Sequence, residues 1–398
     1  MTRKNVGHTF SATKFIVYGD KSLGLTRIFQ IPSLRTLLLV GASFLFCTSL
    51  EAIEKSNASS PVMFDHIMDW ANSISNFINP SKGANFAEWR LSKQPPAPKL
   101  NKLESKKIAL GKMLFFDPRL SGDGKMSCAT CHNPKLGWAD GLPKAHGSGG
   151  KVLRRATPSI INVGYNKILL WDGREQSLEA QAIAPITNPD EMHNTAENLI
   201  RTLKGIPGYV RAFKEAYWGL DINEDRIRRA LASFQRTVIS NSSPFDQWLD
   251  GDDDALTEQQ IRGFQLFLNP KGGNCVLCHR PPNFTDNGFH NIGLSSFGDA
   301  EPDLGRHEQV PLPMTKGAFK TPSLRNVAMT APYFHDGSAR TLAQVMDHYA
   351  AGGVVKTNIS PNMIKPKLSK QDKQDLIEFL FALTGDVDQE LSQVILPE

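Results

Sequence analysis

The feature that most constrains this chain is the pentapeptide Cys-x-x-Cys-His, which occurs twice. The first copy supplies Cys128, Cys131 and His132, and the second supplies Cys275, Cys278 and His279. In c-type haem attachment both cysteines of such a pentapeptide form thioether bonds, and the histidine is the proximal iron ligand. A zinc ribbon is the alternative, but its cysteine pairs lie about 15–20 residues apart, whereas 143 residues separate these pairs. The sequence therefore predicts two covalently bound haem c groups.

The sequence around the two motifs is repeated as well. Residues 111–119 (GKMLFFDPR) precede the first motif, and residues 263–271 (GFQLFLNPK) precede the second. Asp140 follows the first motif histidine by eight residues, and Asp286 follows the second by seven. No stretch alternates between apolar and polar residues as a half-buried strand does. We therefore predict a mainly α protein with two cytochrome c-like haem domains and long loops.

The length of 398 residues allows two to three domains. We predict a signal peptide or N-terminal anchor at 1–52, a spacer arm at 53–100, an N-terminal haem domain at 101–245 and a C-terminal haem domain at 246–398. Capping residues predict that helices begin after Asn223, Thr257, Thr341 and Ser369. Apolar spacing predicts another helix over 102–116, which would support the first haem.

The first 52 residues have the pattern of an export signal. They hold six basic and two acidic residues, and an apolar run over 37–50 follows Arg35. This pattern is typical of a secretory signal, with cleavage after Ala52 or retention as an anchor. Because c-type haem is attached outside the cytoplasm, we predict a periplasmic protein. Residues 53–398 carry 39 basic and 38 acidic side chains, so their charge gives no reason to expect a nucleic-acid partner.

Several further motifs resemble those of the bacterial diheme cytochrome c peroxidase superfamily. The shared segments are LFFDPR (114–119), both haem motifs, TPS (157–159), WDGR (171–174), EM (191–192), TPSLRNV (321–327) and TAPYFHDG (330–337). The resemblance covers about residues 100–385. The superfamily includes MauG, the enzyme that matures tryptophan tryptophylquinone. Membership would imply a peroxide-binding haem in the N-terminal domain and an electron-transfer haem in the C-terminal domain.

The resemblance implies roles for residues around the first haem, whose proximal ligand would be His132. Glu191 matches the family's distal carboxylate, which would move a proton between the peroxide oxygens as the O–O bond breaks. Gln181 would orient the peroxide, and Pro185 would shape the pocket. Trp171 matches the tryptophan that lies between the two haems. Two alternatives stay open: Glu191 as a solvated loop acid, and Trp171 as an ordinary buried aromatic residue.

His146 has two interpretations. It lies in the glycine-rich loop over 141–157, fourteen residues after His132. Many peroxidases of the family hold a loop histidine on the first iron in the oxidised resting state, whereas MauG-like members lack this ligand. His146 is therefore either the distal ligand of the first iron or a solvent-exposed loop residue.

Tyr349 is the expected distal ligand of the second iron. In the family this ligand lies fourteen residues after the histidine of Tyr-Phe-His, which is His335 here. Donor-linked peroxidases have methionine at that position and MauG has tyrosine. A thioether raises the haem potential, whereas a phenolate stabilises ferric iron and lowers it. Alternatives are core packing for Tyr349 and ligation by Met346 one turn earlier, while the adjacent His348 should face elsewhere.

The sequence departs from the family pattern at two positions. The resemblance implies a calcium ion between the domains, bound by an asparagine side chain and two carbonyls. Ala156 stands in place of that asparagine, although the carbonyl positions, Thr330 and Pro332, are retained. MauG also has a surface tryptophan two residues before its second motif, as a relay to its protein substrate. Gly273 occupies that position here, so a MauG-type reaction would need another route.

Three functions fit these motifs. The first, which we predict from the sequence, is a diheme peroxidase that reduces hydrogen peroxide at the N-terminal haem with electrons from a small cytochrome c or cupredoxin, passed through the C-terminal haem; the other two are alternatives. The second is a MauG-like enzyme that oxidises a residue of a partner protein, which Tyr349 favours. The third is an electron carrier with two six-coordinate haems, which Glu191 and Gln181 disfavour because a carrier needs no distal acid. The sequence leaves open whether the protein is a homodimer.

Overall fold

The computed structural model describes residues 83–398, and these residues are mainly helical, as predicted. The helices are α3 (Ser105–Phe116), α4 (Cys128–Cys131), α5 (Leu178–Gln181), α6 (Ala184–Thr187), α7 (Ala196–Lys204), α8 (Pro207–Ala216), α9 (Glu224–Gln235), α10 (Pro244–Leu249), α11 (Glu258–Leu268), α12 (Leu342–Ala351) and α13 (Lys370–Ala382). Two short strands, β1 (Phe289–His290) and β2 (Phe319–Lys320), pair antiparallel. The predicted signal and most of the predicted spacer lie outside the described residues.

The predicted capping residues begin their helices. The side chain of Asn223 accepts a hydrogen bond from the Arg226 amide at the start of α9. Capping boxes at Thr257 and Ser369 open α11 and α13. Gly352 ends α12 with a left-handed backbone, which glycine adopts at no steric cost. These boundaries depend on local hydrogen bonds, so the sequence predicts them well.

Two pairs of crossed helices are built in the same way. Where α3 crosses α9, a Cβ added to Gly111 would lie 1.9 Å from the carbonyl oxygen of Ala230. Where α11 crosses α13, a Cβ on Gly263 would lie 2.0 Å from the carbonyl oxygen of Asp375. Each glycine therefore lets two helix backbones approach closely. Each pair belongs to a separate apolar core, one built on α3 and α9 and one built on α11 and α13.

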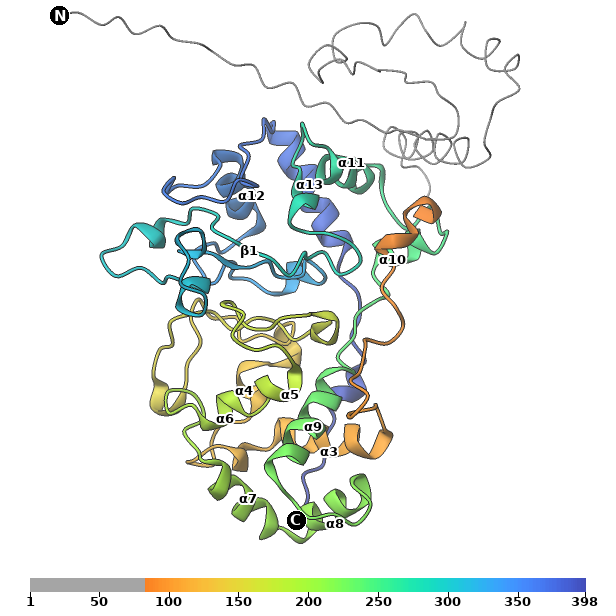
Figure 1. Ribbon diagram of the computed structural model, residues 1–398. Helices are drawn as coiled ribbons and strands as arrows, with labels where there is room; N and C mark the ends of the chain where they lie inside the picture. The colour runs from red at the N-terminus through yellow and green to blue at the C-terminus, as the bar shows by residue number, and fades with distance from the viewer. Residues whose placement is uncertain (1–82) are drawn as a thin grey trace, which may run out of the picture. The chain divides into compact units, whose positions relative to one another are not determined.

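Each end of the described chain contacts the opposite half of the protein: the N-terminal end packs in the second core, and the C-terminal end contacts α8 beside the first core. The short 3-10 helix η1 (Gly83–Trp89) lies beside α10 (Figure 1), and its Phe86 and Trp89 are buried in the second core. At the other end, the carbonyl oxygen of Glu398 accepts a hydrogen bond from the Gly208 amide at the start of α8. The predicted domains place residues 83–89 in the spacer arm and Glu398 in the C-terminal haem domain. They therefore do not anticipate these two contacts.

The loops that follow the two haem motifs repeat each other at an offset of 164 residues. Left-handed backbones occur at Asn162 and Asn326, Leu170 and Phe334, and Gly173 and Gly337. The Ala156 amide donates to the His335 carbonyl at 2.7 Å, and the Lys320 amide donates to the Trp171 carbonyl at 2.8 Å. Because 156 pairs with 320 and 171 with 335, these two hydrogen bonds are reciprocal. The repeat supports the prediction of two cytochrome c-like domains.

Candidate haem sites

The first motif presents a histidine that is prepared for metal binding. Cys128 and Cys131 are the ends of α4, and His132 follows directly. The His132 ring donates from Nδ1 to the Trp138 carbonyl oxygen at 3.2 Å, and Trp138 has a left-handed backbone with φ 57°. Burial lowers the pKa of His132, so its imidazole stays neutral. The hydrogen bond at Nδ1 leaves Nε2 as the ligand atom.

The second motif repeats this arrangement. His279 donates from Nδ1 to the Phe284 carbonyl oxygen at 2.9 Å, and Phe284 also has a left-handed backbone, with φ 52°. Burial lowers the pKa of His279 to about 4. A left-handed backbone is strained for an aromatic residue, and both loops adopt it at the residue whose carbonyl orients the motif histidine. Each motif thus supplies a neutral, oriented imidazole.

The four motif cysteines fit thioether attachment. None of them is in a disulfide bond, and all four are half-buried. Burial raises the pKa of Cys128 and of Cys275 to about 12, so both remain protonated thiols in the absence of a metal. A cavity of about 620 Å³ opens above the first motif. This donor set and this space fit a c-type haem.

The structure brings the predicted residues of the first site together around this cavity. Its lining includes Trp171, Gln181, Pro185, Glu191 and His146 together with Cys128, Cys131 and His132. Gln181 ends the short helix α5, and Pro185 lies in α6. Glu191 follows in a turn in which its amide donates to the Asn188 carbonyl at 3.1 Å. Two short helices and a turn therefore place the distal residues on one wall.

Glu191 is a half-buried carboxyl group with one defined side-chain partner. Burial raises its pKa above the ordinary glutamate value, and the neighbouring charge of Asp190 adds to this. The Asn188 amide opposes the shift by donating from Nδ2 to Glu191 Oε1 at 2.7 Å, as does the positive charge of Arg174. A carboxyl with a raised pKa that faces a haem-sized cavity is suited to proton transfer near neutral pH.

Asn188 and Asp190 should shift the pH dependence of the reaction with peroxide in opposite directions. If ionised Glu191 accepts the first peroxide proton, the rate rises with pH through the pKa of Glu191. Asn188→Ala removes the donor to the carboxylate and should move this rise to higher pH. Asp190→Asn removes a negative charge and should move it to lower pH. Stopped-flow rates measured across pH test both variants, and shifts in the same direction would contradict this assignment.

The loop that carries His146 is fixed to the segment that carries Glu191. The Ser148 amide donates to the Glu191 carbonyl at 2.7 Å, and a Cβ on Gly147 would lie 1.8 Å from the Asp190 carbonyl oxygen. The loop also closes on itself through a bridge between His146 and Val152. His146 lines the first cavity, but its side chain is exposed. These contacts fix the loop beside the first cavity, and both interpretations of His146 stay predictions.

Trp171 lies where the two repeated loops meet. Its Nε1 donates to the Ala156 carbonyl oxygen at 2.9 Å, and its ring centroid is 6.4 Å from that of His335, the equivalent residue in the repeat. The neighbouring Asp172 accepts from Arg155, which also pairs with Asp303 at 2.7 Å. Trp171 is therefore held between the two loops by hydrogen bonds on both its ring and its backbone.

Tyr349 lies beside the second motif. It is in α12 and packs against the second core. Burial raises its pKa, and the nearby thiols of Cys278 and Cys275 raise it further. The 164-residue repeat pairs Tyr349 with Pro185, which lines the first cavity. The equivalent position thus carries a potential ligand at the second motif and a proline, which offers none, at the first.

The two alternatives to Tyr349 are placed differently. Met346 is 8% exposed and belongs to the second core. The His348 ring hydrogen-bonds from Nε2 to the Ile292 carbonyl oxygen at 2.9 Å, so it faces away from the motif, as expected. The assignment of Tyr349 stays a prediction, and Met346 is its competitor.

The structure offers little for the predicted calcium ion. Ala156 has no side-chain oxygen, and its amide and carbonyl are both used in the hydrogen bonds to His335 and Trp171. Within residues 83–398, one cluster has metal-ligand spacing: Cys278, Asp286 and His290. Its His290 Nε2 donates to Asp286 at 2.9 Å and its pKa is raised to about 9, so it forms an ion pair. A thioether at Cys278 would also remove the thiolate.

Two functional candidates escaped the sequence interpretation. Asn188 forms part of Asn-Pro-Asp-Glu, and only the fold shows that its amide contacts the Glu191 carboxyl. Asn362 donates from Nδ2 to Cys278 Sγ at 3.8 Å, across 84 positions of sequence. No local pattern marks Asn362. Asn188 could have been found from its Asx-turn pattern, because its side chain accepts a hydrogen bond from the Asp190 amide.

Fold and sites together define a helical protein with two Cys-x-x-Cys-His motifs and, in the described residues, a cavity at the first motif lined by Trp171, Gln181 and Glu191. Comparison with known proteins identifies the family. The di-haem cytochrome c peroxidase family matches residues 105–254. The methylamine utilization protein MauG of Methylorubrum extorquens is 45% identical over 303 residues, which cover 75% of this chain and 84% of that protein. The chain belongs to the di-haem cytochrome c peroxidase and MauG family.

Relatives from both branches of the family match. Cytochrome c551 peroxidase of Nitrosomonas europaea is 36% identical over 278 residues, or 70% of this chain and 79% of that protein. The crystal structure of a MauG-like protein associated with microbial copper homeostasis superimposes with a TM-score of 0.70 at 32% identity, covering 77% of this chain and 97% of that one. Two haem groups and an oxidoreductase activity of the peroxidase type follow from membership.

Proposed function

We propose that this protein is an exported MauG-type enzyme that uses hydrogen peroxide to oxidise an aromatic residue of a partner protein. The observation that carries the proposal is a tyrosine at position 349, which lies in α12 and packs against the same apolar core as Cys275. By the resemblance described above, donor-linked peroxidases have methionine at that position and MauG has tyrosine. The 45% identity to a MauG protein supports the same branch.

The bound haems would supply the iron that binds peroxide and the centres through which electrons pass. Around the first cavity, Glu191 accepts a proton from one peroxide oxygen and returns it to the other. Asn188 holds the Glu191 carboxyl through Oε1. Gln181 provides an amide on the same wall of the cavity. The chain therefore supplies a proton carrier, a residue that orients it and a polar group for the peroxide.

The overall reaction balances with peroxide as the oxidant. Each peroxide takes up two electrons and two protons and leaves as two water molecules. A tryptophan of the partner loses two electrons, and one C–H bond of its indole is replaced by a C–O bond to an oxygen from water, with release of two protons. Trp171, held between the two repeated loops, offers an oxidisable ring next to His335.

A donor-linked peroxidase is the second candidate. Gly273 stands where MauG has its surface tryptophan, and the 36% identity to a cytochrome c551 peroxidase is consistent with this alternative. The donor would then be a small cytochrome c or cupredoxin. The two candidates share the chemistry at Glu191 and differ in the source of the electrons.

Export to the periplasm remains part of the proposal. Covalent haem c would be attached there, and the basic and apolar pattern of the first 52 residues supports export. Among residues 83–398, no helix combines the length and the apolar character needed to cross a membrane. The experiment that separates the two functions offers the holoprotein both kinds of electron source with peroxide, namely a reduced small cytochrome and a tryptophan in a polypeptide.

A further inference from the structure

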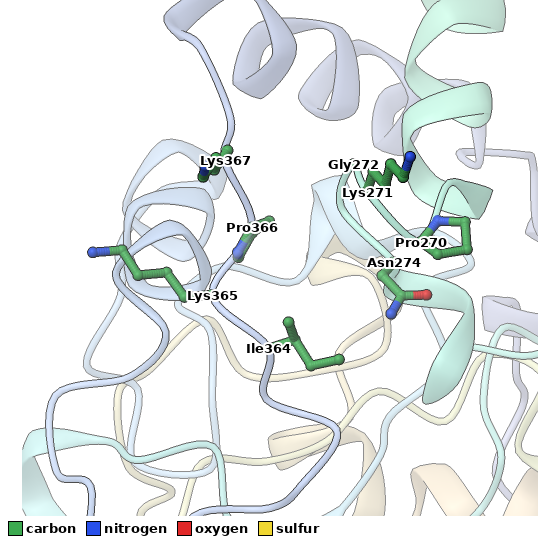
Figure 2. Close-up of a pocket in the computed structure, with 8 residues that line it drawn as sticks. All are labelled: Pro270, Lys271, Gly272, Asn274, Ile364, Lys365, Pro366 and Lys367. Atoms are coloured by element: carbon green, nitrogen blue, oxygen red, sulfur yellow. The ribbon is translucent and has the colours of Figure 1, made fainter. Parts of the chain in front are cut away.

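A shallow pocket lies beside the second motif. Residues 270–274, which follow α11, form one wall, and residues 364–367 form the other, as Figure 2 shows. Its volume is about 330 Å³. We call it the lysine pocket, and its lining includes Lys271, Asn274, Ile364, Lys365 and Lys367.

The segments that form the lysine pocket continue to residues near the sulfur atoms of the second motif. Asn274 directly precedes Cys275, and a Cβ on Gly273 would lie 3.0 Å from Cys275 Sγ. On the other wall, Asn362 contacts Cys278 Sγ two residues before Ile364. A side chain that entered the pocket would therefore come close to the edge of a haem attached at these cysteines.

The lining of the lysine pocket is positively charged, although the C-terminal part of the chain that contains it has more acidic than basic residues. Residues 246–398 hold 13 Lys and Arg against 20 Asp and Glu. None of the pocket's lining residues is acidic. Lys271, Lys365 and Lys367 are exposed, and none of them forms an ion pair with any of the residues that the structure describes. Three exposed cations that line one hollow favour a negatively charged partner.

The lysine pocket also has apolar lining residues. Ile364 is 58% exposed, and its side chain extends from the 364–367 segment toward Asn274 in Figure 2. Pro270 and Pro366 complete the apolar lining. An apolar hollow with a charged rim resembles the centre and edge of a protein interface, where a buried aromatic side chain contributes most of the affinity.

We propose that the lysine pocket is the docking site for an acidic surface of the partner protein, and that an aromatic side chain of the partner enters it. This inference rests on the proposed function and identifies its partner by charge. It also explains how the chain manages without a relay tryptophan at Gly273. A side chain at that position would meet Cys275 and the Leu266 carbonyl oxygen, so the partner's own ring would take the place next to the haem.

Binding of two synthetic peptides to the holoprotein without peroxide tests the docking site separately from the reaction. One peptide has a tryptophan between glutamates, and the other has an alanine between the same glutamates. We expect salt-sensitive binding of the tryptophan peptide and weaker binding of the alanine peptide. The variant K271E/K365E/K367E should bind the tryptophan peptide about tenfold or more weakly, since each exposed ion pair contributes up to ~1 kcal/mol and reversal adds repulsion.

The matched control reverses three exposed lysines of the first half of the chain, K102E/K204E/K214E, which carry no ion pair with any described residue. It should bind within about twofold of the wild type. Equal binding by the two triple variants, or equal binding of the two peptides, would overturn the proposal. Intact binding without any oxidation after peroxide is added would instead contradict the proposed function and leave the docking site standing.

Discussion

Replacing Glu191 with glutamine should slow the reaction of the protein with hydrogen peroxide by ~10²–10⁴-fold, the usual contribution of a general acid–base group. Glutamine keeps the length of the side chain and an oxygen that can accept from Asn188 Nδ2, but it cannot carry the proton between the peroxide oxygens. The haem spectra of the resting protein should stay nearly unchanged, because Glu191 is assigned no bond to the iron. Stopped-flow spectroscopy at several peroxide concentrations measures the rate.

Asp190→Asn is the matched control for this substitution. Asp190 is adjacent in sequence, but its carboxylate pairs with Lys151 rather than with Asn188. At a pH above the range in which the rate rises with the ionisation of Glu191, the Asp190→Asn variant should react within a few-fold of the wild type. A Glu191→Gln variant that reacts as fast as Asp190→Asn would remove Glu191 from the proton transfer.

The second large effect is expected for Tyr349→Met. If the phenolate binds the second iron, a thioether in its place should raise the potential of that haem by on the order of 100 mV or more, since axial ligands set haem potentials over roughly 0.8 V. The variant should also oxidise a reduced cytochrome faster, because the second haem becomes a better acceptor. Redox titration followed by visible spectroscopy gives the potential, and EPR reports the change of ligand.

Met346→Leu separates ligation from packing in this experiment. Met346 lies one turn before Tyr349 and is buried in the same core, so leucine preserves most of its volume. The spectrum and potential of the second haem should be unchanged in Met346→Leu. If this variant shifts them and Tyr349→Met does not, Met346 is the ligand and Tyr349 is core packing.

Local chemistry explains what the sequence could predict. A haem motif is five consecutive residues, and the caps at Asn223, Thr257 and Ser369 involve partners three residues away. The mainly α class followed from such local signals. The candidate residues Trp171, Gln181 and Glu191 came from family motifs, and the structure brings all three to one cavity.

The relation between Pro185 and Tyr349 could have been found from the sequence but was missed. The motif histidines are 147 positions apart, whereas the two Thr-Pro-Ser segments are 164 apart. The second loop is thus 17 residues longer, which hides the repeat that pairs the two positions. By contrast, the contacts of Asn362 with Cys278 and of Trp89 with the second core join distant segments. Such contacts depend on tertiary packing and leave no local pattern.

The measurement that tests the central claim most directly compares two electron sources for the wild-type holoprotein. Hydrogen peroxide is added to the protein with either a reduced small cytochrome c or the acidic tryptophan peptide, and both products are followed in time. We predict that mass spectrometry finds one added oxygen atom on the peptide tryptophan, and that the cytochrome is oxidised slowly. Rapid peroxide-dependent oxidation of the cytochrome, with the peptide unmodified, would contradict the account and identify a donor-linked peroxidase.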